Sequence, residues 1–209
     1  MRAITFLPLA SLWLLPSCRE AGATPQGATR GMGQAAAGAP AAVFLADGEL
    51  QRPRGYRSWI HVGTPLTPND LNNGKAAFPE FHTVYVDPAS YRHYLQTGEW
   101  RDGTVMVKEL TDVGGKAATS GNGYFQGEFI GVEASVKSRD RFLTEPGHWG
   151  FFRFTDEGGG PPHRTAAAMP TAACAACHAA AAGQDLVFTQ YYPVLRAAKK
   201  AGAGAPEDG

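Results

Sequence analysis

The chain has 209 residues, and its 19 Lys and Arg balance its 19 Asp and Glu, so the formal net charge at pH 7 is zero. Charged residues make up 18% of the chain and form no basic stripe, which argues against a nucleic-acid partner. About 155–160 residues remain when the low-complexity ends are set aside, which is the size of one compact domain.

The N-terminal segment has the organisation of a secretory signal. Arg2 supplies a short positive region, and residues 4–15 form an apolar stretch that is too short for a typical membrane span. Residues 15–18 (Leu-Pro-Ser-Cys) resemble a bacterial lipobox, in which Cys18 becomes the lipidated N-terminus; the alternative is ordinary cleavage near residues 21–23. Both alternatives predict an exported, periplasmic protein, and the lipobox alternative adds membrane contact through a lipid on Cys18.

The composition divides the chain into four segments. A stretch rich in Ala, Gly, Pro and Gln follows the signal and indicates a flexible tether, and the Gly- and Ala-rich C-terminus indicates a frayed tail. The predicted boundaries are 1–18 for the signal peptide, 19–42 for the tether, 43–200 for a single folded domain and 201–209 for the tail.

Short strands and short helices are predicted within the folded part. A helix at 89–96 begins after the capping residue Asp87 and ends before Gly98, and a loop is predicted over 114–123. The other helices are predicted at 67–71 and 193–200. The strands are predicted at 82–86, 104–110, 124–136 and 149–154.

Consecutive strands joined by loops predict a mostly antiparallel sheet with the short helices at its periphery, so the predicted fold class is α+β in a single domain. The sequence shows no long heptad-like periodicity, which excludes a four-helix bundle. Any cofactor of this domain is therefore expected to lie against a sheet.

Residues 174–178 (Cys-Ala-Ala-Cys-His) carry the most informative motif of the chain. The C-x-x-C-H pattern is typical of c-type haem attachment, in which Cys174 and Cys177 add to the two vinyl groups of one haem. His178 then lies under the ring and ligates the iron as a neutral imidazole. The Ala-rich context disfavours a thioredoxin-like pair, and the lack of a second C-x-x-C disfavours zinc.

The distribution of methionines predicts an open sixth position on the iron. No Met or His follows His178, whereas a small electron-transfer cytochrome c takes a Met ligand from downstream of its motif. An open position favours small-molecule binding or chemistry over simple electron transfer. Ligation by Met169 or by an upstream His is the alternative.

One face of the strand at 124–136 suggests how the haem is held. Residues two apart share a face, and this face carries Phe125, Gly127, Phe129, Gly131 and Glu133. Two glycines weaken a strand unless something approaches the backbone closely, so we expect a flat haem edge against them, flanked by the two Phe, with Glu133 in an apolar pocket. The alternative is a bent strand with bulges and a solvated Glu.

Six segments together resemble the cytochrome P-460 family and its relatives, the β-sheet (c′-beta) cytochromes. The resemblance covers residues 50–198. Its segments are 56–64, 83–88, 102–110, 121–125, 170–178 and 188–195.

The resemblance implies a small homodimeric periplasmic cytochrome with one haem c per chain and a lysine covalently joined to a haem meso carbon. Lys108, in the segment Thr-Val-Met-Val-Lys-Glu-Leu, matches that lysine. Relatives without it bind NO and similar gases but do not oxidise hydroxylamine. By its strand pattern alone, a lone Lys is usually a solvated outward side chain, although Lys108 shares a face with Met106 and Leu110.

The resemblance also implies two polar residues over the open iron face. Glu133 matches an acidic proton relay, and an acid in an apolar haem pocket is expected to have a raised pKa. His82 stands where well-known members have Arg, and it either donates to a bound ligand, moves protons or points away.

The function implied by the resemblance is oxidation of hydroxylamine to nitrous oxide through an iron nitrosyl, with electrons leaving to a soluble acceptor, another c-type cytochrome. Two alternatives remain open at this point. The first is a protein that captures NO or hydroxylamine without turnover, and the second is an electron carrier, which the absence of a downstream Met weakens.

Overall fold

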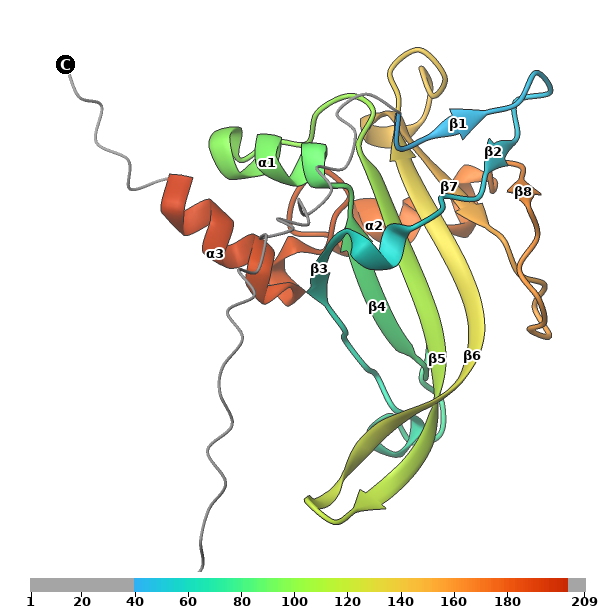
Figure 1. Ribbon diagram of the computed structural model, residues 1–209, viewed down its shortest axis with the longest axis vertical. Coiled ribbons are helices and arrows are strands. Elements are labelled where there is room, and N and C mark those ends of the chain that lie inside the picture. The colour runs from blue at the N-terminus through green and yellow to red at the C-terminus, as the bar shows by residue number, and fades with distance from the viewer. Residues whose placement is uncertain (1–39, 203–209) are drawn as a thin grey trace, which may run out of the picture. The chain divides into compact units, whose positions relative to one another are not determined.

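A computed structural model describes residues 40–202 of the chain. The predicted signal peptide and lipobox at Cys18, most of the tether and most of the tail lie outside these residues. The described part is α+β as predicted, with two antiparallel sheets and three short α-helices (Figure 1). Within residues 40–202, no helix combines the length and the apolar character that crossing a membrane requires.

The larger sheet has five strands in the order β3-β4-β5-β6-β7, and each pairs antiparallel with its neighbour. These strands are β3 (Ile60–Gly63), β4 (Phe81–Val86), β5 (Val105–Ala118), β6 (Gly121–Lys137) and β7 (Trp149–Arg153). A second, small sheet has the order β1-β2-β8, which are Val43–Phe44, Leu50–Gln51 and Thr165–Ala166. Strands β1, β2, β3 and β8 were not predicted.

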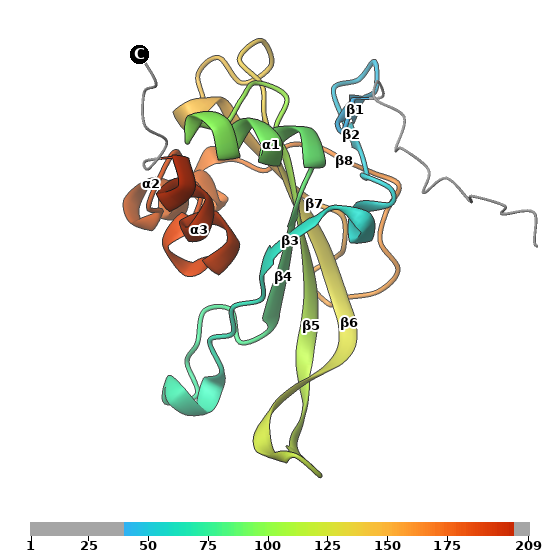
Figure 2. The same cartoon turned by 60° about the vertical axis from the view of Figure 1, so that its left-hand side comes forward.

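The helices are α1 (Pro88–Thr97), α2 (Ala175–Ala181) and α3 (Pro193–Gly202). They lie on one side of the large sheet, and the small sheet lies on the other side (Figures 1 and 2). Five 3-10 turns complete the elements: η1 (Tyr56–Ser58), η2 (Asn69–Leu71), η3 (Pro146–His148), η4 (Thr171–Ala173) and η5 (Thr189–Tyr191).

Helix α1 forms as its sequence predicts. The Asp87 side chain caps it by accepting from Ser90 N at 2.9 Å, and Gly98 ends it in the left-handed conformation (φ 71°). The second oxygen of Asp87 accepts from Val105 N at 3.0 Å, so one buried carboxylate ties the start of α1 to the start of β5.

Two apolar cores flank the large sheet, because successive side chains of a strand point to opposite faces. The core on the helix side includes Val86, Tyr94, Met106 and Leu195. The core on the side of the small sheet includes Leu50, Val105, Val107 and Phe152. Met106 therefore faces the helices while its neighbours Val105 and Val107 face away from them.

The first half of β5 and the last half of β6 pair in regular register. Val84, Lys108, Glu133 and Arg153 lie directly opposite one another on β4, β5, β6 and β7, so they form one row on the helix side of the sheet. We call residues 105–110 and 131–136 the regular segment.

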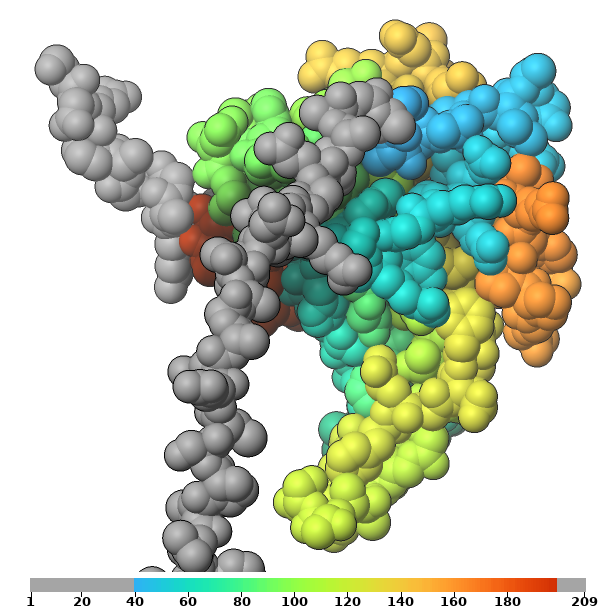
Figure 3. Space-filling model, in the orientation of Figure 1, coloured from blue at the N-terminus to red at the C-terminus, as the bar shows by residue number. Residues whose placement is uncertain are grey.

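Beyond Leu110 the register of the same two strands shifts four times. Leu110 pairs with Gly131 and Thr111 pairs with Phe129, which leaves Ile130 as an extra residue, and three further shifts follow towards the tip. We call residues 111–118 and 121–130 the bulged arm. Its tip projects beyond the rest of the described residues (Figures 1 and 3).

The predicted loop at 114–123 is wrong, because these residues belong to the bulged arm. Strand β5 continues to Ala118 and β6 begins at Gly121, so only two residues form the connection. Two glycines permit a close approach of the strands: a Cβ on Gly127 would lie 2.6 Å from the Cα of Gly114. The glycines that led to the loop prediction therefore allow the two strands to pair closely.

Candidate functional site

A cavity of about 310 Å³ lies on the helix side of the large sheet. The row from Val84 to Arg153 forms part of its wall, and the C-x-x-C-H segment and residues 186–192 contribute another part. Most of the remaining lining is apolar or aromatic, including Phe78, Phe151 and Phe188. The cavity therefore has the character of a site for a large flat apolar group that needs a few polar contacts.

Both motif cysteines line this cavity. Cys174 is the residue before α2 and is half-buried, whereas Cys177 lies within α2 and is exposed. Burial, and then the nearby charge of Glu133, raises the pKa of the Cys174 thiol above its ordinary value. The two thiols are unpaired and available for the thioether chemistry that the motif predicts.

The His178 imidazole is oriented by one strong hydrogen bond. Its Nδ1 lies 2.7 Å from the carbonyl oxygen of Leu186, and since a carbonyl only accepts, Nδ1 carries the proton and Nε2 keeps a free lone pair. The ring lies between Phe151 and Phe188, with centroid distances of 4.7 and 4.8 Å. Burial lowers the pKa of His178 below its ordinary value, although the bond to Leu186 opposes this, so the imidazole is in the neutral form that ligates iron.

Lys108 points into the cavity rather than outward to solvent. Its Nζ lies 2.7 Å from Glu133 Oε2, and the same nitrogen lies 5.8 Å from the centre of the Phe78 ring. Its side chain is 29% exposed, so the amine reaches the cavity but is not sealed in it. Strand alternation, which puts Lys108 on the face of Met106, produces this placement.

Glu133 lies between two cations. Arg153 Nε donates to its Oε1 at 3.2 Å, and Lys108 pairs with its Oε2. Burial alone raises the pKa of Glu133, but Lys108 and then Arg153 outweigh burial, and the pKa lies below its ordinary value. The raised pKa expected from an apolar pocket is therefore wrong for this arrangement, in which Glu133 is a carboxylate at neutral pH.

Arg153 is the charged residue of the cavity lining that sequence reasoning missed. It ends β7 and reaches Glu133 because the two residues pair across β6 and β7. The charge of Arg153 at the end of an aromatic strand was a signal that could have found it. The register of β6 and β7 that aligns Arg153 with Glu133 could not be predicted from the sequence, because residues 138–148 between the strands form no regular hairpin turn.

His82 also lines the cavity and is 19% exposed. Its Nε2 lies 3.3 Å from Glu80 Oε1, and its ring is 6.0 Å from that of Phe78. Burial, and then the charge of Lys108, lowers the pKa of His82 below its ordinary value, so the ring is mostly neutral at pH 7. Of the three outcomes expected for His82, pointing away from the site is excluded.

Four predicted cavity contacts are corrected, because the cavity lining omits Phe125, Gly127, Phe129 and Gly131. The first three belong to the bulged arm, and the bulge at Ile130 breaks the alternation that was assumed to align them with Glu133. Gly131 keeps its register with Glu133 but does not line the cavity.

Other side chains occupy the space over these glycines. A Cβ on Gly127 would lie 2.1 Å from Asp112 Oδ1, and one on Gly131 would lie 2.8 Å from Thr155 Oγ1. Phe125 is exposed, and Phe129 packs against the core on the side of the small sheet. The expected haem edge over the two glycines is therefore wrong, and the alternative of a bent strand with bulges describes this part of β6.

Two methionines, Met106 and Met169, line the cavity as well. Met169 N donates to Phe151 O at 2.7 Å, which fixes the chain beside β7 just before the haem motif. Met169 stays the alternative sixth ligand that the sequence left open.

The donors that meet in the cavity fit a c-type haem. Cys174 and Cys177 supply two thiols and His178 an imidazole nitrogen with its other nitrogen already satisfied, and aromatic rings form the walls. These are the groups that covalent attachment, axial ligation and apolar packing of one macrocycle require.

Comparison with known proteins agrees with this site. The Cytochrome P460 family matches residues 53–189, which is more than half of the chain and includes the whole cavity wall from β4 to α2. No curated protein matches the chain in sequence.

Proposed function

This chain belongs to the cytochrome P460 family and is a haem c protein of that family, and from this premise we propose that it is an enzyme that oxidises hydroxylamine to nitrous oxide. The observation that supports the proposal is the position of Lys108, whose amine lies in the same cavity as both motif thiols and His178. We propose that Lys108 bonds to the haem in addition to thioether links at Cys174 and Cys177.

When bound, the haem supplies an iron that binds hydroxylamine and accepts its electrons. His178 would ligate the iron through Nε2, because Nδ1 is committed to Leu186. Phe151 and Phe188 restrict rotation of that imidazole, since both rings pack against it. The chain therefore holds this ligand in a fixed orientation.

Glu133 is the proposed proton acceptor. Oxidation of hydroxylamine releases protons, and a carboxylate within the cavity takes them more readily than bulk water reached through a hydrophobic wall. The charge of Arg153, whose Nε donates to Oε1 at 3.2 Å, favours the ionised form of Glu133, which is the state that a base needs. Arg153 orients the carboxylate from the side of β7 and keeps doing so once the Lys108 nitrogen is no longer a primary ammonium.

His82 is the second polar group proposed to face the ligand. In its neutral form one ring nitrogen donates and the other accepts, so it either stabilises a bound ligand or passes a proton to Glu80, its partner at 3.3 Å. Turnover of a His82→Ala variant separates its contribution from that of Glu133.

A second candidate function is capture of NO or hydroxylamine without turnover. The 2.7 Å ion pair between Lys108 and Glu133 favours it, because an ammonium held by a carboxylate is not nucleophilic. The two candidates differ in the fate of Lys108: the enzyme has it bonded to haem, and the binding protein keeps it as an ion-pair partner.

The proposed setting follows from the family resemblance. We propose that the protein is an exported, periplasmic homodimer that passes electrons to a soluble acceptor, another c-type cytochrome. Membrane contact is proposed only through a lipid on Cys18.

The optical spectrum of the purified, reduced protein tests the proposed function. A Soret band shifted strongly to the red, together with hydroxylamine-dependent release of nitrous oxide, is the expected result. An ordinary c-type spectrum with tight NO binding and no turnover would contradict the proposed oxidation and support the second candidate function, capture without turnover.

A further inference from the structure

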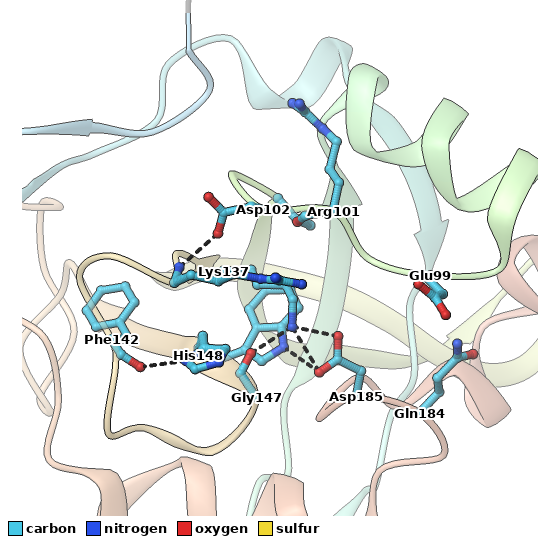
Figure 4. A network of polar contacts seen from close by, with 12 residues as sticks. Glu99, Arg101, Asp102, Lys137, Phe142, Gly147, His148, Gln184 and Asp185 are labelled. Carbon is cyan, nitrogen blue, oxygen red and sulfur yellow. Dashed lines mark hydrogen bonds and ion pairs between the residues drawn. The ribbon is translucent and has the colours of Figure 1, made fainter.

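Lys137, the last residue of β6, has a buried ammonium group. The residue is 7% exposed, and its Nζ lies 2.7 Å from the Gly147 carbonyl oxygen and 2.8 and 3.1 Å from the two carboxylate oxygens of Asp185 (Figure 4). A charge buried to this degree is costly unless it is paired and fully hydrogen-bonded. Each of the three ammonium protons has an acceptor here.

Asp185 is held from a second direction by Trp149. The indole Nε1 donates to Asp185 Oδ1 at 3.3 Å, and the centre of the same ring lies 5.4 Å from Lys137 Nζ. Gly147 makes room for this carboxylate, because a Cβ at that position would lie 2.8 Å from Asp185 Oδ1. Lys137, Gly147, Trp149 and Asp185 form a unit that we call the clasp.

The clasp fixes a tight turn with an unfavourable backbone. Gln184 and Val187 exchange backbone hydrogen bonds of 2.8 and 3.3 Å, and the two residues between them, Asp185 and Leu186, have φ values of +45° and +59°. Asp tolerates this left-handed region, but a Leu there costs free energy that the surroundings must offset. Such a turn keeps its shape only if contacts hold it.

The carbonyl of this strained residue is the one that orients the axial ligand. Leu186 O accepts from His178 Nδ1 at 2.7 Å. A carbonyl aimed at the distal nitrogen of a ligating imidazole sets its tautomer and raises its basicity. The path from the clasp to the ligand is therefore short: Asp185, the adjacent Leu186 carbonyl and the His178 ring.

We propose that the Lys137–Asp185 pair is a positioning device for the proximal ligand, which fixes the Leu186 carbonyl on His178 and thereby tunes the strength of the iron–imidazole bond. The proposal requires that His178 ligates the haem iron, and it does not require that hydroxylamine is the substrate. It concerns residues other than Lys108 and Glu133, on which the proposed function rests.

Resonance Raman spectroscopy of the reduced, haem-loaded protein tests this directly through the iron–histidine stretching frequency. Lys137→Met and Asp185→Asn are both expected to lower that frequency, because the released turn weakens the hydrogen bond at Nδ1. The double variant is expected to shift no further than either single variant, since both remove the same pair. Asp185→Asn keeps the side-chain size and a residue that tolerates positive φ, so it tests the proposal even if Lys137→Met does not fold.

Val136→Ala is the matched control. Val136 precedes Lys137 on β6 but packs in the core on the side of the small sheet, so its truncation is expected to lower the unfolding temperature and leave the frequency unchanged. If Asp185→Asn behaves like this control, with reduced stability and an unshifted iron–histidine frequency, the pair is only structural and the proposal is overturned. If the wild-type protein shows no hydroxylamine turnover while Asp185→Asn still shifts the frequency, the proposed function is contradicted and this inference is not.

Discussion

The β5–β6 ribbon consists of two parts that use the same two strands differently. In the regular segment, residues pair one to one, and Lys108 and Glu133 lie opposite each other in the cavity. In the bulged arm, four register shifts rotate the side chains irregularly, and none of its Phe or Gly residues lines the cavity. Regular pairing is what brings the polar groups of β5, β6 and β7 into one row, so the part of this ribbon that takes part in the chemistry is expected to be the regular segment.

This contrast between the two parts can be tested by substitution. Substitutions at the cavity should alter haem attachment or reactivity. Substitutions in the bulged arm should change the free energy of unfolding and leave the haem unaffected.

Replacing both motif cysteines is expected to have the largest effect. The Cys174→Ala/Cys177→Ala variant should contain no thioether-bound haem, because these two are the cysteines that line the cavity among the described residues. Peptide mapping measures this: the peptide that contains residues 174–178 should carry haem in the wild-type protein and none in the variant. Cys18→Ala is the control of the same residue type and is expected to keep its haem bound.

Glu133→Gln is expected to slow turnover by about 10²–10⁴-fold, the usual loss when a general base is removed. Hydroxylamine binding to the ferric protein should survive, since Gln keeps the size and much of the hydrogen bonding. The matched control is Glu109→Gln, which is in the regular segment but pairs with Arg57 rather than lining the cavity. Equal turnover rates for the two variants would show that Glu133 has no specific role in the reaction.

The ion pairs of Glu133 should also affect the pH dependence of the free energy of unfolding. The pKa of Glu133 is lowered in the folded protein by Lys108 and Arg153, against the effect of burial. Its contribution to stability is therefore fully present above the unfolded carboxyl pKa of about 4.3 and is lost as the pH falls through the folded value. Urea unfolding of wild type and Glu133→Gln should differ at neutral pH and converge in acid. A difference that grows as the pH falls would contradict the assigned ion pairs.

Gly127→Ala should have a smaller effect, confined to folding. The new methyl group would meet Asp112 Oδ1 and Gly114 Cα, and such overpacking typically costs about 1–3 kcal/mol. Gly115→Ala is the matched control in the same arm, because nothing lies within 4 Å of a Cβ there. Both variants should keep the wild-type haem spectrum. A changed haem spectrum in Gly127→Ala would indicate that the bulged arm is part of the haem site after all.

Local rules predicted much of this molecule correctly. Capping by Asp87 and the glycine at 98 defined α1, and strand alternation put Lys108 on the face of Met106. These succeeded because each depends on a few neighbouring residues. The fold class followed from the order of short strands for the same reason.

Features that depend on pairing across distant strands could not be predicted. The bulge at Ile130 follows from how β5 and β6 pack, so the alternation assumed for 124–136 failed beyond it. Lys108 and Arg153 reach Glu133 only through the registers of β5–β6 and β6–β7. Without these two cations, the pKa of Glu133 was expected to be raised rather than lowered. The clasp at Lys137 joins residues 48 positions apart and leaves no local pattern.

Peptide mapping of the native protein tests the central claim most directly, namely that the haem lies against the regular segment of the sheet. After proteolysis, the fragment that absorbs as haem should contain both the Cys174–His178 segment and a peptide with Lys108. Haem attached to the Cys174–His178 segment alone, with Lys108 recovered unmodified, would contradict the proposed bond and leave a ligand-binding protein in place of the enzyme.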